Sequence, residues 1–215
     1  MTIEGRKVKS ELFEHLPFTA FGVCLGLILV AVAHIILSSS GTTKTHEGME
    51  GLFYIFHALH IFLAALTSTA VSFRVGRDPI RASLISAFTT IPFCILSDAI
   101  MPYLGGHLFQ MDIEFHISAP EQPLVVFSFL VFGILSGLVS EKKIGRVSYF
   151  SHSAHVLLSS FASMFYLVGY GADNWVKTLG PLFLITFVAV IIPCCMSDIV
   201  FPISFTHAEH DHPHI

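Results

Sequence analysis

Six long apolar stretches without a single Lys or Arg constrain this chain more than any other feature of its sequence. They cover residues 16–37, 52–73, 82–104, 123–139, 147–170 and 179–205. A run of about 20 apolar residues is long enough to cross the hydrocarbon core of a bilayer. Such stretches predict helices, because a helix satisfies its own backbone hydrogen bonds in lipid. The sequence therefore predicts an all-α integral membrane protein with six transmembrane helices.

The composition supports the same class of protein. Charged residues make up 12% of the chain, whereas about a quarter is usual in soluble domains. The net charge of −4 gives no reason to expect a nucleic-acid partner. All four cysteines lie inside apolar stretches, which argues against a disulfide framework. The partner that the composition predicts is the lipid bilayer.

The basic residues predict the orientation, because Lys and Arg are enriched in the cytoplasmic segments of membrane proteins. With a cytoplasmic N-terminus, nine of the 11 Lys and Arg residues lie inside, and only Lys44 and Lys177 lie outside. Both termini are therefore predicted to be cytoplasmic, in a membrane that we expect to be a prokaryotic plasma (inner) membrane. The segment 105–122 is then an external loop with acidic and histidine side chains, and 206–215 is a His-rich cytoplasmic tail.

Two motifs occur twice in the same order, which predicts an internal duplication. C-x-x-S-D-x-x-x-P lies in the third and sixth stretches, and H-x-x-H lies in the second and fifth. The residues are Cys94, Asp98 and Pro102 with Cys194, Asp198 and Pro202, and His57 and His60 with His152 and His155. Units of three spans must insert in opposite orientations. We therefore predict a segment 1–15, a first repeat at 16–104 and an inverted second repeat at 123–205, a plan common in secondary transporters.

The duplicated residues predict two metal half-sites inside the membrane. Residues three or four apart share one helix face, so each histidine pair projects together. From their positions along the stretches, His57 and Asp98 are placed near the outer face, and His152 and Asp198 near the inner face. Imidazole, carboxylate and thiolate groups bind zinc and other transition metals. The predicted metal ligands are His57, His60, Asp98, His152, His155 and Asp198.

Further side chains are candidates for the same sites or for the pathway between them. They are Cys94, Cys194, His34, Glu14 and His15. The two cysteines are as well explained by packing, because a membrane cysteine is often a small apolar filler. The histidine of the first stretch is more typical of a hydrogen bond between helices. Pro102 and Pro202 are predicted to break their helices and free a carbonyl beside each aspartate.

Three classes of function fit these residues. The duplication favours a transporter for a divalent transition-metal cation of the Zn, Fe, Mn, Co or Ni class, with Asp98 and Asp198 as ligands and proton-coupling groups. A membrane haem or redox protein with axial histidines is an alternative, although pairs at opposite faces cannot share one haem. An intramembrane metalloenzyme is another, but H-E-x-x-H is absent. We expect a transporter rather than an enzyme. A homodimer is an open alternative because six helices are few for such a protein.

Overall fold

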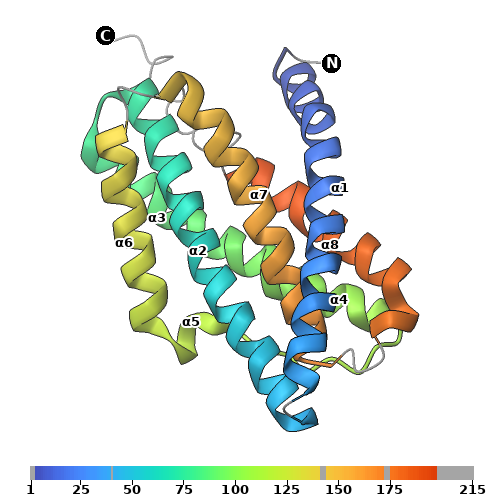
Figure 1. Cartoon of the computed structure of the whole chain (residues 1–215). Helices are drawn as coiled ribbons and strands as arrows, with labels where there is room; N and C mark the ends of the chain where they lie inside the picture. The colour runs from blue at the N-terminus through green and yellow to red at the C-terminus, as the bar shows by residue number, and fades with distance from the viewer. Residues whose placement is uncertain (1–2, 40, 141–143, 172–174, 198–215) are drawn as a thin grey trace, which may run out of the picture.

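The computed structural model describes the chain except for residues 1–2, 40, 141–143, 172–174 and 198–215. Every regular element within these described residues is a helix. The helices α2 and α7 lie side by side at the centre, with α6 against α2 and α1 against α7 (Figure 1). The all-helical prediction is confirmed for the part of the chain that the structure describes.

The elements begin and end at well-defined residues. In chain order they are α1 (Ile3–Ser38), α2 (Thr42–Gly76), α3 (Pro79–Ile95), η1 (Leu96–Ile100), α4 (Met101–Leu108), α5 (Ser118–Glu121), α6 (Pro123–Ser140), α7 (Ile144–Gly169), η3 (Trp175–Thr178) and α8 (Leu179–Cys195).

Five helical segments are long and apolar enough to cross a membrane. They are Leu16–Ser38, Lys44–Arg74, Pro79–Leu108, Pro123–Ser140 and Trp175–Cys194. The predicted stretch 147–170 falls within α7, but its described apolar part, Ser153–Gly169, is shorter than these five. The stretch opens with the polar sequence S-Y-F-S-H-S after Val147. Membrane-crossing length is thus confirmed for five of the six predicted stretches.

A tight turn brings α3 back alongside α2. Arg77 ends α2 in the left-handed conformation, with a φ angle of 56°. Asp78 then begins α3: its carboxylate accepts hydrogen bonds from the backbone N–H groups of Ile80 and Arg81, at 2.9 and 3.2 Å. Pro79 occupies the first helical position, where its missing N–H costs nothing. The turn therefore aligns α3 antiparallel to α2.

Glycines allow α6 to approach α2 closely. A Cβ added at Gly133 would lie 2.5 Å from the carbonyl oxygen of Phe62, and one at Gly137 would lie 2.7 Å from that of Leu66. Neither position has room for a side chain. The two glycines form a G-x-x-x-G pattern, which allows close backbone contact between membrane helices.

A second pair of glycines lies where α1 packs against α7. A Cβ added at Gly22 would lie 3.1 Å from Ser160 Oγ, and one at Gly26 would lie 3.5 Å from the ring of Phe161. This pair is also G-x-x-x-G. The helix that opens each predicted repeat therefore packs, through glycines, against the H-x-x-H helix of the other.

Candidate metal centre

Four polar side chains converge inside the helix bundle. His57 and His60 come from α2, Asp98 comes from η1, and His155 comes from α7. Each is at most 2% exposed. His57 and His60 lie three residues apart, so α2 turns both toward its neighbours on one face. An unpaired polar group costs roughly 2–7 kcal/mol to bury, so the contacts of these four side chains are central to their role.

The carboxylate of Asp98 is surrounded by hydrogen-bond donors. Oδ2 accepts from Nδ1 of His57 at 2.8 Å and from Nδ1 of His60 at 2.6 Å. Oδ1 accepts from the hydroxyl of Ser97 at 2.7 Å and from that of Ser159 at 2.8 Å. A carboxylate offers about four lone-pair positions, and all four are used. Because both histidines donate from Nδ1, each keeps Nε2 as its ligand nitrogen.

Asp98 lies in a widened turn of its helix. In η1 the N–H of Met101 bonds to the carbonyl of Leu96, five residues earlier. Such π turns occur frequently at functional sites. The predicted break at Pro102 is not found: the helical path continues from Pro79 through η1 to Leu108. The π turn accommodates Pro102, because the hydrogen bonds have already changed from a four-residue to a five-residue spacing where the proline lacks an N–H group.

The second copy of the motif has the same irregularity. Met196 and Ser197, which occupy the positions of Leu96 and Ser97 in the first copy, are also in π-helical conformation. In the first copy the Ser97 carbonyl accepts a hydrogen bond from the hydroxyl of Ser163 on α7, at 3.0 Å. The π turn is therefore connected directly to the opposite half of the chain.

Nε2 of His60 is the meeting point of the two halves. It lies 2.6 Å from Nε2 of His155. Cys94 Sγ lies 3.8 Å away and Cys194 Sγ lies 3.9 Å away, and both cysteines are buried. The ligand atoms of His60, His155 and Cys194 all lie within 4.8 Å of one another. The nitrogen and sulfur donors of these three residues, from α2, α7 and α8, thus surround one point inside the protein.

No protein-family model, curated protein or solved structure matches this chain. Its function must therefore be argued from the chemistry of the centre.

The two histidine pairs meet through one member of each, although they were predicted to lie toward opposite faces of the membrane. His60 and His155 are in direct contact. The helices α2 and α7 run antiparallel (Figure 1), and the second histidine of each pair lies one turn deeper than the first. The deeper histidines therefore meet where the two helices cross.

Other predicted residues do not join the centre or cannot be placed. His34 is half-buried and stands edge-on to Trp175, with ring centroids 5.9 Å apart. It belongs to neither of the two groups of candidate ligands found among the described residues, which are His60, His155 and Cys194, and His57, His60 and Asp98. Outside the described part of the structure lie Asp198 and Pro202, and the side chains of Glu14, His15 and His152. Their roles remain predictions.

Serine hydroxyls are the functional residues that the sequence reasoning missed. Ser159 donates to Asp98, and Ser163 donates to the Ser97 carbonyl. Ser97 also donates to Asp98. The signal was present in the duplicated motif, where a serine precedes the aspartate in both copies.

A second polar cluster holds the predicted external loop against α2 and α7. The Tyr54 hydroxyl donates to Glu121 at 2.6 Å and contacts Nε2 of His116 at 2.5 Å. His116 also pairs with Glu121, and its ring stacks on Tyr170 with centroids 4.4 Å apart. The loop histidine and glutamate are therefore bound to one another and to the helices.

An aromatic layer separates this loop cluster from the centre. Phe53 is fully buried and stacks on His57, with ring centroids 5.4 Å apart. Its other face and edges meet Tyr166 and Tyr170. In this conformation the histidines are closed off from the loop side by aromatic rings.

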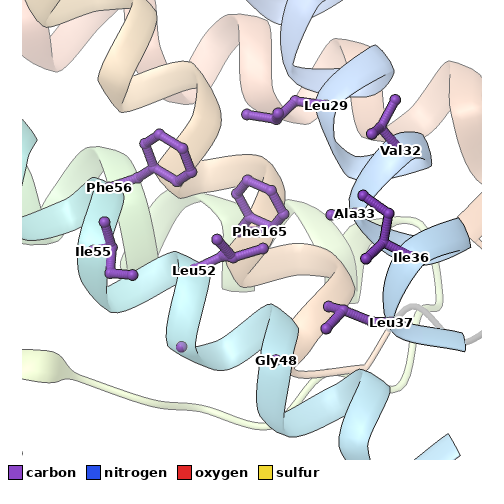
Figure 2. A pocket seen from close by; sticks show the side chains of 11 residues that line it. Leu29, Val32, Ala33, Ile36, Leu37, Gly48, Leu52, Ile55, Phe56 and Phe165 are labelled. Carbon is purple, nitrogen blue, oxygen red and sulfur yellow. The ribbon is translucent and has the colours of Figure 1, made fainter. Parts of the chain in front are cut away.

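An apolar cavity lies elsewhere in the described part of the structure. It is a groove of about 470 Å³ between α1 and α2, with Phe165 of α7 at its floor. Figure 2 shows only carbon atoms in the side chains that line it. The groove offers no ligand atom for an ion. Its apolar lining is suited to contact with lipid chains, so the function is inferred from the buried polar centre instead.

Proposed function

We propose that this chain is a membrane transporter for a transition-metal cation, which binds inside the bilayer between the two halves of the protein. The observation that carries the proposal is the convergence of His60 and His155 on one point, flanked by Cys94 and Cys194. Buried imidazole and sulfur donors that face one another are the ligand types that bind such metals.

Energetics favour a functional reading of this cluster. Ionisable side chains within membrane-crossing helices are expensive and mark ion or substrate pathways by default. Replacing a buried ionic network by apolar residues is often neutral or stabilising. Asp98 and its four hydrogen-bond donors are therefore poorly explained by stability alone.

We further propose six spans in two inverted three-helix repeats, with both termini in the cytoplasm. The repeated motifs, the paired π turns and the reciprocal G-x-x-x-G contacts support the duplication. The distribution of Lys and Arg supports the orientation. Reporter fusions in 105–122 and after 205 test it. Activity of an extracytoplasmic reporter at the first position only is expected, and the reverse pattern would contradict the orientation.

The geometry supports the two alternative functions less well. Ligation of one haem by both histidines needs their nitrogens on opposite sides of the iron and its ring, whereas Nε2 of His60 and Nε2 of His155 are only 2.6 Å apart. A metalloenzyme needs an open coordination position and access for its substrate. Phe53 and its aromatic neighbours close the centre from the loop side.

Metal binding and flux in purified protein test the proposal. Detergent-purified protein should retain a stoichiometric transition metal, and liposomes containing it should take up that metal. The variant His60→Ala/His155→Ala should lose both activities, because it removes both nitrogens at the convergence point. His34→Ala is the matched control, since it removes a membrane histidine outside the cluster.

Two outcomes would contradict the proposal. One is the absence of bound metal after incubation with Zn²⁺, Fe²⁺ and Mn²⁺. The other is bound metal without any flux above that of empty liposomes. A chain truncated after Phe205 separates the centre from the His-rich tail, and it should keep both activities. Proton coupling and a homodimer remain predictions, tested by imposed pH gradients and by light scattering of the purified protein.

A further inference from the structure

We propose that the ion is held by Nε2 of His60 and His155 and by the thiolates of Cys94 and Cys194, with Asp98 outside the coordination shell. The transported ion then belongs to the Zn²⁺ class of thiophilic, tetrahedrally bound cations, and Mn²⁺ is excluded. This inference names the substrate class of the proposed transporter and rests on that function.

Asp98 is a positioning residue because its oxygens are already occupied. Oδ2 faces His57 and His60, and Oδ1 faces Ser97 and Ser159, all within 2.8 Å. A metal bond to either oxygen would displace one of these donors. A carboxylate that accepts from one nitrogen of a histidine commonly orients the other nitrogen toward a metal. Asp98 holds His60 in that way.

The ligand atoms of His60, His155 and Cys194 lie within 4.8 Å of one another, close enough to hold one tetrahedral ion after a small adjustment. Cys94 Sγ is near His60 but does not belong to that group, so it would have to move closer when the ion binds. Bond lengths of about 2.05 Å to nitrogen and 2.3 Å to sulfur give about 3.5 Å between a nitrogen and a sulfur ligand. The distances from His60 Nε2 to the two sulfurs are 3.8 and 3.9 Å. The two nitrogens, 2.6 Å apart, would separate to about 3.3 Å. Their present hydrogen bond would be replaced by two metal–nitrogen bonds.

Charge and ligand softness select the ion. Two thiolates neutralise a divalent cation, so the filled coordination shell carries no net charge into the bilayer interior. Each thiol must lose its proton when the ion binds. Thiolate with imidazole in tetrahedral geometry favours Zn²⁺, whereas Mn²⁺ prefers carboxylate, carbonyl and water oxygens.

Co²⁺ is the probe that tests this ligand set, because it reports its ligands spectroscopically and is a surrogate for Zn²⁺. Purified protein loaded with Co²⁺ should show the visible bands of a tetrahedral ion and a thiolate-to-cobalt charge-transfer band. Zn²⁺ should remove both, and a roughly 100-fold excess of Mn²⁺ should not. Cys94→Ser/Cys194→Ser should lose the charge-transfer band. Cys24→Ser should keep it, since Cys24 is exposed on α1.

Asp98→Asn tests the positioning role. The charge-transfer band should remain while metal affinity falls about 10–100-fold, the usual effect of losing an orienting partner. A tetrahedral spectrum without thiolate bands in the wild type, or an unchanged spectrum in the double cysteine variant, would overturn the inference. Both outcomes concern only the ligands of the ion, so they would not contradict metal transport as the proposed function. Thiolate bands without flux would instead sink the transport proposal.

Discussion

The hydroxyl groups of Ser97 and Ser159 each donate to the Oδ1 atom of Asp98, one from its own helix and one from α7. Together with the two imidazoles that donate to Oδ2, they give the buried carboxylate a full set of hydrogen bonds from the protein itself. The contribution of Ser159 is easy to isolate, because its neighbour Ser160 is equally buried and, among the described residues, donates to its own helix, at the carbonyl oxygen of Val156.

Ser159→Ala should therefore lower the free energy of unfolding in detergent by about 1–2 kcal/mol, since it removes a hydrogen bond to a buried charged group. Ser160→Ala should change it by less than about 0.5 kcal/mol, because the carbonyl it contacts keeps its helical partner. Thermal unfolding of the two purified variants provides the measurement. Equal effects would argue that Ser159 is only a packing residue.

His57 differs from His60 in the use of its second nitrogen. Its Nδ1 donates to Asp98, and its Nε2 is buried without a hydrogen-bond partner among the described residues. A free imidazole nitrogen beside the centre is suited to receive an ion in transit. His57→Gln, which keeps a donor for the carboxylate, should slow metal uptake about tenfold while leaving equilibrium binding nearly unchanged. Parallel measurements of the uptake rate and of equilibrium binding test this prediction. An uptake rate in the variant equal to that of the wild type would contradict it.

At the scale of helices, the two glycine contacts differ in tightness. Gly133→Ala should cost about 1–3 kcal/mol, because its Cβ would overlap the Phe62 carbonyl of α2. Gly26→Ala should be tolerated within about 0.5 kcal/mol, since its Cβ would make ordinary contacts at 3.5 Å. Gly51→Ala on α2 meets nothing within 4 Å and serves as the control. Chemical denaturation in detergent ranks the three, and equal effects would contradict the packing described for α6.

The helices could be predicted because their cause is local. A backbone in lipid must close its own hydrogen bonds, so a charge-free apolar stretch is enough to locate a helix. Helix periodicity likewise places His57 and His60 on one face. The polar opening of the stretch 147–170 limits the prediction there, because the helix includes residues whose hydropathy is too low to indicate a membrane span.

The contact between His60 and His155 could not be predicted because its cause is not local. It depends on where α2 and α7 cross, which is determined by packing against α1 and α6 through glycines far away in the sequence. The same holds for Ser159, whose hydroxyl reaches Asp98 only once that crossing is formed. The candidate residues could be identified from the sequence, whereas the partners of each residue could be identified only from the three-dimensional structure.

At the scale of the whole molecule, the structure is closed between the loop cluster and the centre. Phe53→Ala should open this barrier, because it removes the ring that stacks on His57. A membrane-impermeant thiol reagent added from the loop side should then modify Cys94 and Cys194 several-fold faster, measured in a Cys24→Ser background. Phe56→Ala is the control, since Phe56 lines the apolar groove in Figure 2. Equal reactivity of both variants would refute a barrier at Phe53.

The meeting of His60 with His155 also bears on ancestry. On the proposed duplication, each three-helix unit carries only half of the ligands. A single unit, encoded before the duplication, could have formed the centre only by pairing with a second copy inserted upside down in the same membrane. An ancestral protein of this kind had to insert into the membrane in both orientations. On the same proposal, the asymmetry of Lys and Arg in the present chain would have been acquired after the duplication, when each copy could be committed to one orientation.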